Sequence, residues 1–154
     1  MTEHLIRPID AEDTRALRHA VLRPGQPFEA TRYEEDAAPE TAHFGCFRAG
    51  KLVGVASVYR EPSPKAEDAQ GWRLRGMATD PEVRGLGCGR ALLNAVAGHA
   101  AGQGGDLLWC NARSTAAGFY LGAGFRQIGT EYDVPGLGPH YFMQKRLSGA
   151  ETSA

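Results

Sequence analysis

Runs of apolar residues, some alternating with polar ones and some continuous, occur along almost the whole chain. They predict strands at residues 4–8, 43–48, 52–59, 72–79, 106–111, 125–132 and 141–145. The segment 52–59 is apolar at both alternating sets of positions, which is typical of a strand in the middle of a sheet. Apolar residues at helical spacing predict a helix over 90–101 and a short one around 116–121.

The first helix is predicted to begin after Asp10, a residue type that caps helix N-termini. The apolar residues that share one side of this helix are Leu17, Ala20 and Val21. We expect that side to face the core. Residues 25–41 contain proline and many acidic residues with weak periodicity, so they predict a loop with one irregular helical turn around Tyr33.

Length and composition fit one globular domain. The chain has 154 residues, of which 42% are hydrophobic and 23% charged, values close to those of ordinary soluble domains. No internal repeat or linker is visible, so we expect a single domain at residues 1–147 and a disordered tail at 148–154. The order of strands and helices predicts a mixed α/β fold.

Charge and composition exclude several classes of protein. The net charge of -1 argues against a nucleic-acid-binding surface. No apolar run is long enough to span a membrane and no secretory signal is present, so we expect a cytoplasmic protein with no membrane partner. An odd number of cysteines without a Cys-x-x-Cys pair predicts reduced thiols, and the histidines show no metal-ligand spacing, so no metal is expected. The cysteines are Cys46, Cys88 and Cys110, and these histidines are His4, His19, His43 and His99.

Glycine is the unusual component, with 20 residues in the chain against an average of about 7%. Three of them alternate in the segment Arg84-Gly85-Leu86-Gly87-Cys88-Gly89, which lies between a predicted strand and a predicted helix. Backbone amides at a helix N-terminus bind phosphate, and glycine lets a ligand approach them. A tight strand-to-helix turn is the alternative interpretation. The segment lacks the Lys-Ser/Thr ending of an ATP-binding loop and the spacing of a dinucleotide-binding one.

This loop resembles the Arg/Gln-x-x-Gly-x-Gly/Ala pyrophosphate loop of the GNAT (Gcn5-related) N-acetyltransferases. Met77-Ala78-Thr79-Asp80-Pro81 is similar to the strand end that precedes it in that family, and Asn111 with residues 116–120 and 124–125 is similar to a second family motif. The resemblance covers nearly the whole chain. It implies the GNAT fold, a mixed and mainly antiparallel central sheet flanked by helices, with acetyl-CoA as co-substrate and an amine of a small molecule or peptide as acceptor.

The same resemblance implies which residues contact acetyl-CoA. Main-chain groups of Met77 and Thr79 would pair with the pantetheine arm, and the thioester would lie between Ala78 and Asn111. The residues implied in cofactor binding are Met77, Ala78, Thr79, Arg84, Gly85, Leu86, Gly87, Cys88, Gly89, Arg90, Asn111 and Tyr120. Cys88 also lies at a helix N-terminus, but a nucleophile there would be beside the pyrophosphate, so a covalent cysteine mechanism is disfavoured.

Tyr120 aligns with the tyrosine that donates to the departing CoA sulfur in similar enzymes. Its ordinary pKa of about 10 exceeds that of a thiol at about 8.5, so full proton transfer costs roughly 2 kcal/mol. Hydrogen-bond stabilisation of the thiolate is therefore at least as plausible as proton donation. The alternative is that Tyr120 packs against Phe119 as an ordinary amphipathic residue.

The general base is harder to assign. Many relatives have a glutamate on the fourth strand, where this sequence has Arg75. His140, in a Gly-Pro-His segment that resembles the ElaA-like branch of the family, is the preferred base because imidazole accepts a proton at neutral pH. Glu131 or a chain of waters could serve instead, and His140 could merely cap a turn. Arg73, Arg75, Glu131 and His140 could also bind the acceptor, although charged strand residues are often only solvated.

We therefore expect an acetyl-CoA-dependent N-acetyltransferase that brings both substrates together for direct transfer. A non-catalytic acyl-CoA-binding sensor or regulatory module is the first alternative, favoured by Arg75 where relatives have an acid. A nucleotide-binding protein is the second. The sequence leaves the oligomeric state open, a homodimer included.

Overall fold

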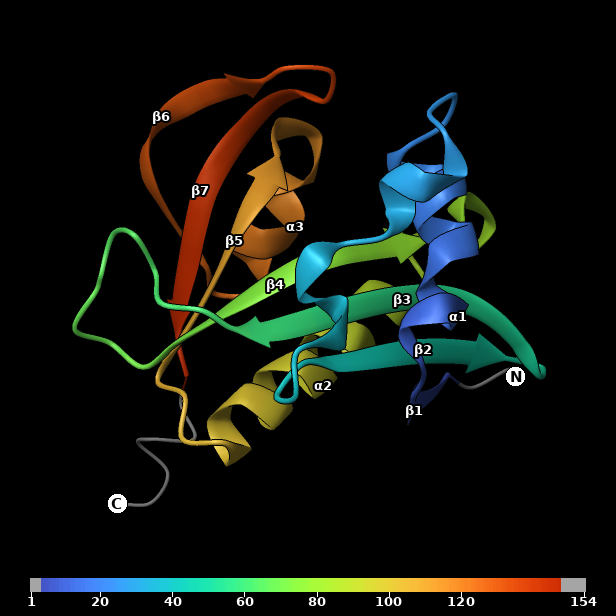
Figure 1. Cartoon of the computed structure of the whole chain (residues 1–154), viewed down its shortest axis with the longest axis horizontal. Coiled ribbons are helices and arrows are strands. Elements are labelled where there is room, and N and C mark those ends of the chain that lie inside the picture. The colour runs from blue at the N-terminus through green and yellow to red at the C-terminus, as the bar shows by residue number, and fades with distance from the viewer. Residues whose placement is uncertain (1–3, 148–154) are drawn as a thin grey trace. The chain divides into compact units, whose positions relative to one another are not determined.

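The computed structural model describes residues 4–147 (Figure 1). The expected tail at 148–154 lies outside these residues. Within them the strands are β1 Leu5–Pro8, β2 Ala42–Arg48, β3 Lys51–Arg60, β4 Gly71–Thr79, β5 Leu107–Arg113, β6 Arg126–Val134 and β7 Gly138–Arg146. They form a seven-stranded sheet in the order β1-β2-β3-β4-β5-β7-β6. The β4 and β5 strands are parallel, while β1-β2, β2-β3, β5-β7 and β7-β6 are antiparallel. The predicted mixed, mainly antiparallel sheet is confirmed.

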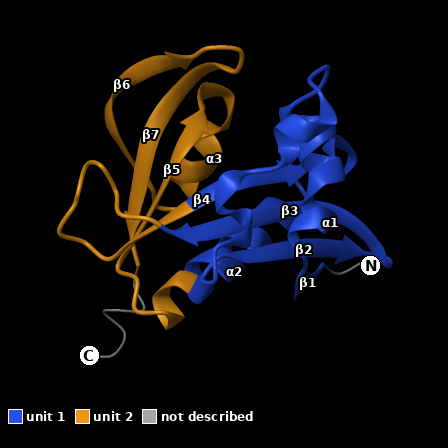
Figure 2. Cartoon of the chain, in the orientation of Figure 1, with its two compact units in different colours: residues 1–60, 74–99 blue, residues 61–73, 100–154 orange. Residues whose placement is uncertain are grey.

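The chain forms two compact units (Figure 2). Unit 1 holds residues 1–60 and 74–99, and unit 2 holds residues 61–73 and 100–154. Strand β4 contributes to both, because its first three residues belong to unit 2 and the rest to unit 1. No helix within residues 4–147 is long and apolar enough to cross a membrane.

In unit 1, strand β3 supplies much of the core. Its residues 53–59 are all buried, which confirms the central position predicted from its two apolar faces. It pairs with β2 through a tight turn in which Ala49 and Gly50 have φ angles of 51° and 79°. The left-handed conformation at both positions is what a two-residue hairpin turn requires.

The first helix differs from its sequence pattern. An α-helix, α1 at Ala11–Leu17, continues as a π-helical segment, η1 at Arg18–Leu22. The prediction of which side of this helix faces the core is wrong, because Leu17 and Val21 are only partly buried and Ala20 is exposed. The buried residues are instead Thr14, Arg15 and Arg18. Polar residues can occupy a core face when every charge finds a partner there, and most of these partners come from the loop that follows.

That loop contains two short helical turns rather than one. They are the 3₁₀ segments η2 at Phe28–Thr31 and η3 at Glu34–Ala37. Tyr33 lies between them and is only 5% exposed. The expected irregular turn around Tyr33 is thus a pair of turns on either side of a buried aromatic residue.

Helix α2 at Cys88–Gly102 follows the glycine segment and a 3₁₀ turn, η4 at Pro81–Val83. It begins two residues earlier than predicted, so Gly89 belongs to the helix and not to the turn before it. Leu92 and Val96 are fully buried, and a Cβ added at Gly54 of β3 would lie 2.9 Å from Leu92. The absence of a side chain at Gly54 therefore lets α2 pack closely on the sheet.

Unit 2 is built on β5, β6 and β7, with the 3₁₀ turn η5 at Ser114–Ala116 and helix α3 at Ala117–Gly122 after β5. Trp72, Leu107, Leu108 and Met143 form its buried interior. Strand β7 begins at Gly138, earlier than the sequence predicted, so His140 lies within the strand and not before it. Its partner across the β6-β7 ladder is Tyr132.

Candidate functional site

The loop after β4 exposes its backbone at the N-terminus of α2. Gly85 and Gly87 have φ angles of 81° and 95°, in the left-handed region that residues with side chains avoid. A Cβ at Gly85 would meet nothing within 4 Å, and one at Gly87 would meet only the ring of His4, at 3.7 Å. Residues 88 and 89 begin helix α2, and amides in the first turn of a helix lack a carbonyl partner within the helix. Loop and helix therefore present backbone donors on an open surface.

Two residues of this segment already have internal contacts. The amide of Leu86 donates to the carbonyl of Val83 at 3.2 Å, so this amide is used in the loop itself. The Arg84 guanidinium lies 3.5 Å from the carbonyl oxygen of Thr79. Arg84 is exposed, which leaves most of its donors facing solvent.

Cys88 points inward from this loop. Its thiol is 1% exposed, and a Cβ at Gly54 would lie 2.6 Å from its sulfur. Burial, together with a hydrogen bond to Cys46, raises the pKa of Cys88 to about 12. All three cysteines are buried and free. The thiol of Cys88 is therefore held protonated inside unit 1, unlike an activated nucleophile.

Burial alternates along the part of β4 in unit 1. Arg75, Met77 and Thr79 are partly exposed, while Gly76 and Ala78 are buried. Arg75 therefore shares a strand face with two residues expected to contact acetyl-CoA. Gly76 has a φ of 69°, and a Cβ there would lie 3.0 Å from Nε of Arg18. A glycine is needed at this position by both the backbone and the neighbouring arginine.

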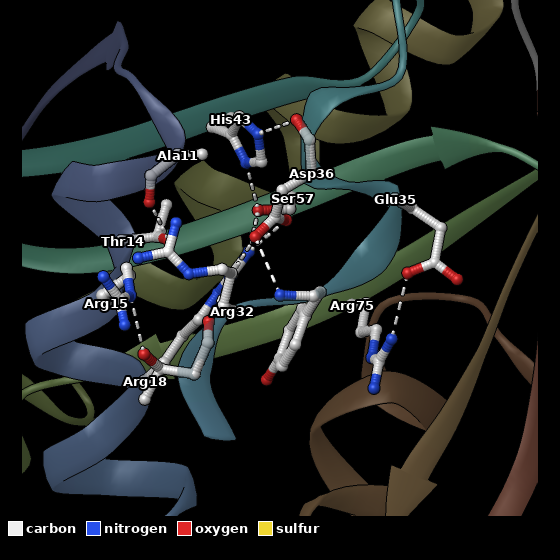
Figure 3. Close-up of polar contacts among 12 residues, drawn as sticks. Ala11, Thr14, Arg15, Arg18, Arg32, Glu35, Asp36, His43, Ser57 and Arg75 are labelled. Atoms are coloured by element: carbon white, nitrogen blue, oxygen red, sulfur yellow. Dashed lines mark hydrogen bonds and ion pairs between the residues drawn. The ribbon is translucent and has the colours of Figure 1, made fainter. Parts of the chain in front are cut away.

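Arg18 is the centre of a buried polar cluster in unit 1 (Figure 3). Its side chain is fully buried, and its two terminal nitrogens donate to the carboxylate of Asp36 at 2.8 and 3.0 Å. The same nitrogens donate to the carbonyl of Thr31 at 2.8 Å and to the hydroxyl of Ser57 at 2.9 Å. A buried guanidinium is tolerated because a bidentate carboxylate neutralises its charge.

Asp36 joins this cluster to the backbone of the loop. Its carboxylate accepts from the Tyr33 amide at 3.1 Å and from the Tyr59 hydroxyl at 3.2 Å. Burial raises the pKa of Asp36, but the hydrogen bond and charge of Arg18 outweigh it, and the pKa is lowered below the ordinary 3.8. His43 lies 2.6 Å from the Ser57 hydroxyl and 3.2 Å from the Asp36 carbonyl. Both the carboxylate and the main-chain carbonyl of Asp36 therefore hold turn η3 in place.

Arg75 and Glu35 form a partly exposed ion pair beside this cluster (Figure 3). Nη1 of Arg75 donates to Oε1 of Glu35 at 3.2 Å, and the two side chains are 31% and 33% exposed. The guanidinium carbon of Arg75 lies 3.9 Å from the centre of the Tyr33 ring, as does that of Arg18. Arg23 lies over the same ring at 5.8 Å, so Tyr33 has three cations near its aromatic system.

A pocket of about 450 Å³ lies near α1 and η3 in unit 1, lined in part by Glu12, Arg15 and Arg32. Its arginines are paired with acids. Arg15 contacts Glu12 at 3.2 Å and Glu29 at 3.5 Å, and Arg32 contacts the same two acids at 3.4 and 3.5 Å. Both arginines of the pocket are therefore neutralised by acids, and Glu34 adds a further carboxylate to its lining.

In unit 2, Tyr120 lies on α3 and is 6% exposed. Its ring makes edge contacts with Phe119 and Phe125, with centroids 5.0 and 5.3 Å apart. Burial raises the pKa of Tyr120 well above 10, and the nearby Cys110 raises it further. The phenol is thus a hydrogen-bond donor that retains its proton.

His140 is 5% exposed, and its Nδ1 lies 2.8 Å from the Gly138 carbonyl. A carbonyl only accepts, so Nδ1 carries a proton, and in the neutral imidazole the lone pair is on Nε2. The His140 ring stacks on Tyr132 at 6.2 Å, and the Tyr132 hydroxyl donates to Oδ1 of Asn111. Asn111 and His140, both predicted site residues, therefore meet through a tyrosine that the sequence did not single out.

The remaining predicted residues have local partners. Glu131 is exposed and accepts from the Ser114 hydroxyl at 2.7 Å. Arg73 lies 3.6 Å from Glu61 and 5.1 Å from the Trp109 ring. Glu35 and Arg18 were missed by the sequence interpretation, because no motif spacing distinguishes them. Within residues 4–147, no group of three or more His, Cys, Asp or Glu residues could hold a metal ion.

Comparisons with known proteins agree with this geometry. The family model for the acetyltransferase (GNAT) domain matches residues 9–147. The uncharacterized N-acetyltransferase YitI of Bacillus subtilis (strain 168) is 37% identical over 142 residues, 92% of this chain and 95% of that protein. An aminoglycoside 6'-N-acetyltransferase complexed with coenzyme A has a TM-score of 0.74 at 16% identity, over 93% of this chain and 97% of its own. Escherichia coli ElaA has a TM-score of 0.70 at 18% identity, over 94% and 99%.

Proposed function

Because this chain belongs to the GNAT family of acetyltransferases, we propose that it transfers the acetyl group of acetyl-CoA directly to a primary amine of a small molecule or peptide. The observation that carries this proposal is the exposed glycine loop between β4 and α2. We further propose that residues 1–147 act as one GNAT domain, since the family model spans both compact units.

The loop residues fit a pyrophosphate. Gly85 has open space beside it, Gly87 has only the His4 ring near it, and a side chain would strain the backbone at both positions. The amides of residues 88 and 89 lie in the first turn of α2, at the positive end of the helix dipole. The amides of 85 and 87–89 would hold the phosphates, with Arg90 beside them. Arg84 would add charge, and main-chain groups of Met77 and Thr79 would pair with the pantetheine arm. Acetyl-CoA supplies the activated acyl group and the acceptor supplies the amine that attacks it, so that the N–C bond forms as the C–S bond of the thioester breaks.

Tyr120 is proposed to stabilise the departing thiolate by a hydrogen bond. Its pKa is raised well above 10, which increases the cost of giving its proton to a thiolate with a conjugate pKa of about 8.5. The raised pKa therefore favours hydrogen-bond donation over full proton transfer. The phenol would lower the barrier by meeting the developing negative charge.

His140 is proposed as the general base that removes a proton from the acceptor ammonium. Its Nδ1 is committed to the Gly138 carbonyl, so the free lone pair on Nε2 has a fixed direction. Asn111 and Tyr132 would support the same region of unit 2. Arg75 and Glu131 are proposed to contact the acceptor.

The alternative of a non-catalytic acyl-CoA-binding module rested on an arginine, Arg75, where relatives have an acid. The carboxylate of Glu35 lies beside that arginine. An acid is therefore present at this position of the strand face, although it comes from turn η3.

The three buried free thiols fit a reducing compartment, so we propose that the protein is cytoplasmic. Fractionation of cells that express it would test this location. Light scattering of the purified protein would test whether it forms a homodimer.

Thiol release from acetyl-CoA, measured across amino acids, peptides, polyamines and aminoglycosides, tests the activity. We expect release that depends on an amine. Tight CoA binding without amine-dependent release would support the non-catalytic module, and protection by ATP or NAD but not CoA would support a nucleotide-binding protein.

The variant Gly87→Glu tests the cofactor site. It introduces a side chain at a φ of 95° and a negative charge beside the expected phosphates, so CoA binding should be lost. Gly98→Glu is the matched control, because Gly98 is exposed in α2 with nothing within 4 Å of an added Cβ. Equal CoA affinity in both variants would contradict the assignment of the loop.

A further inference from the structure

The Arg75 and Glu35 pair has unused hydrogen-bonding capacity on a partly exposed surface. Among residues 4–147, Arg75 donates only from Nη1 and only to Glu35. A guanidinium has five N–H donors, so four remain for solvent or a ligand. Glu35 accepts through Oε1, and its Oε2 has no partner among the same residues. Both members of the pair can therefore bind a further group without leaving a buried charge.

This pair is rigidly supported. The guanidinium of Arg75 stacks on Tyr33, which is buried and also contacts Arg18. Glu35 precedes Asp36, whose carboxylate is held by the buried Arg18, and the Thr41 hydroxyl donates to the Glu35 carbonyl at 2.8 Å. A site that is already ordered loses little conformational entropy when a ligand binds.

The pair also lies near a residue of β4 that is expected to contact the cofactor. Arg75 shares the partly exposed face of β4 with Met77, which is expected to contact the pantetheine arm. Two residues of a strand span about 6–7 Å. An acceptor that contacts Arg75 and Glu35 would therefore need to be small to place its amine at the thioester.

Building on the acetyl-transfer function proposed above, we propose that Arg75 and Glu35 recognise an acceptor that carries a carboxylate beside its amine, as an α-amino acid does. The acceptor carboxylate binds the free N–H groups of Arg75 in a bidentate manner. Its ammonium binds the carboxylate of Glu35. Each member of the Arg75–Glu35 ion pair, 3.2 Å apart, thereby gains an oppositely charged group of the acceptor as a partner.

Charge balance favours this class of acceptor over a polycation. A lone ammonium near Glu35 would be attracted by the carboxylate and repelled by Arg75 at comparable distance. The neighbouring charges of Arg15, Arg18 and Arg32 are likewise matched by acids. A zwitterion gains from both members of the pair, whereas a polyamine or aminoglycoside meets the charge of Arg75 beside the carboxylate that attracts it.

The decisive experiment compares each of several L-amino acids with its α-carboxamide as acceptor in the thiol-release assay. We expect kcat/KM to favour the acid by about 10- to 100-fold, the range of one charge-assisted recognition contact. In Arg75→Gln this preference should fall to near unity, mainly through KM for the acid. Arg75→Lys should retain part of it. Glu35→Gln should weaken the acid and the amide alike, because both carry the ammonium.

Arg60→Gln is the control, because it removes an arginine from a surface ion pair with Glu40 and should leave the preference unchanged. Calorimetric binding of the same acid and amide to the CoA-saturated protein tests recognition separately from turnover. Equal binding of the two, equal losses for both in Arg75→Gln, or a preference for spermidine or kanamycin would overturn the proposal. Absence of thiol release with every amine, but with acid-selective binding, would instead contradict the proposed activity and leave the recognition site supported.

Discussion

Replacing Asp36 by asparagine should destabilise the protein strongly, because it removes the counter-charge of a buried arginine. The Arg18 side chain is 0% exposed and that of Asp36 is 9% exposed. Asparagine keeps nearly the same shape but loses the charge behind two hydrogen bonds of 2.8 and 3.0 Å. Breaking a buried ion pair by removing one partner costs about 3–5 kcal/mol. For a protein of this size, we expect the melting temperature to fall by roughly 6–20 °C.

The matched control is Glu40→Gln, which also changes an acid into an amide. Glu40 and Arg60 form a shorter ion pair, at 2.7 Å, but their side chains are 49% and 51% exposed. Water solvates these charges after the pair is broken, so the free energy of unfolding should fall by at most about 1 kcal/mol. Distance alone would rank the two pairs in the opposite order.

Denaturation in guanidinium chloride, with linear extrapolation to water, measures both losses. The slope of the unfolding free energy against denaturant should stay constant, so that the midpoint alone reports stability. If Asp36→Asn costs no more than Glu40→Gln, then burial does not decide the strength of the Arg18 pair, and the reasoning is refuted.

Three further predictions concern titration and catalysis. The pKa of Asp36 is lowered below 3.8, so the ionised carboxylate stabilises the fold above pH 3.8, and this contribution is lost as the pH falls through the lowered pKa. Denaturation at several pH values should show this loss of stability in acid for the wild type and not for Asp36→Asn. Burial raises the pKa of Cys88 to about 12, so iodoacetamide at neutral pH should label this thiol only after unfolding. Mass spectrometry measures the labelling, and rapid labelling of the native protein would contradict the burial of Cys88. Tyr120→Phe should lower kcat by about 10- to 100-fold with little change in CoA affinity, and unchanged turnover in the thiol-release assay would remove its proposed role.

Local patterns predicted most of the elements but not the polar side of the first helix. Leu17, Ala20 and Val21 are the apolar residues there, yet Arg18 is the one that is fully buried. A hydrophobicity pattern treats every arginine as exposed, because burying its charge without a partner is costly. The partner, Asp36, is 18 positions away, and nothing in the sequence indicates that the two residues meet.

The predicted site residues show the same division. The glycine loop was found from the sequence, because positive φ angles at Gly85 and Gly87 require glycine and the motif is continuous. The contacts of Tyr132 with Asn111 and with the His140 ring depend on strand register. Register places residues opposite each other across a ladder, and the chain order alone does not specify it.

The sequence by itself determined the strand and helix order, the position of the glycine loop and hence the family, since each depends on neighbouring residues and their local conformational preferences. Only the tertiary structure decided that the charge of Arg18 is buried and that Glu35 is the acid that pairs with Arg75. Glu35 is 40 positions from Arg75, and the two meet because the Arg18 and Asp36 pair fixes turn η3 against the sheet. Electrostatic interactions act through space, so their partners follow from the packed fold and not from proximity along the chain.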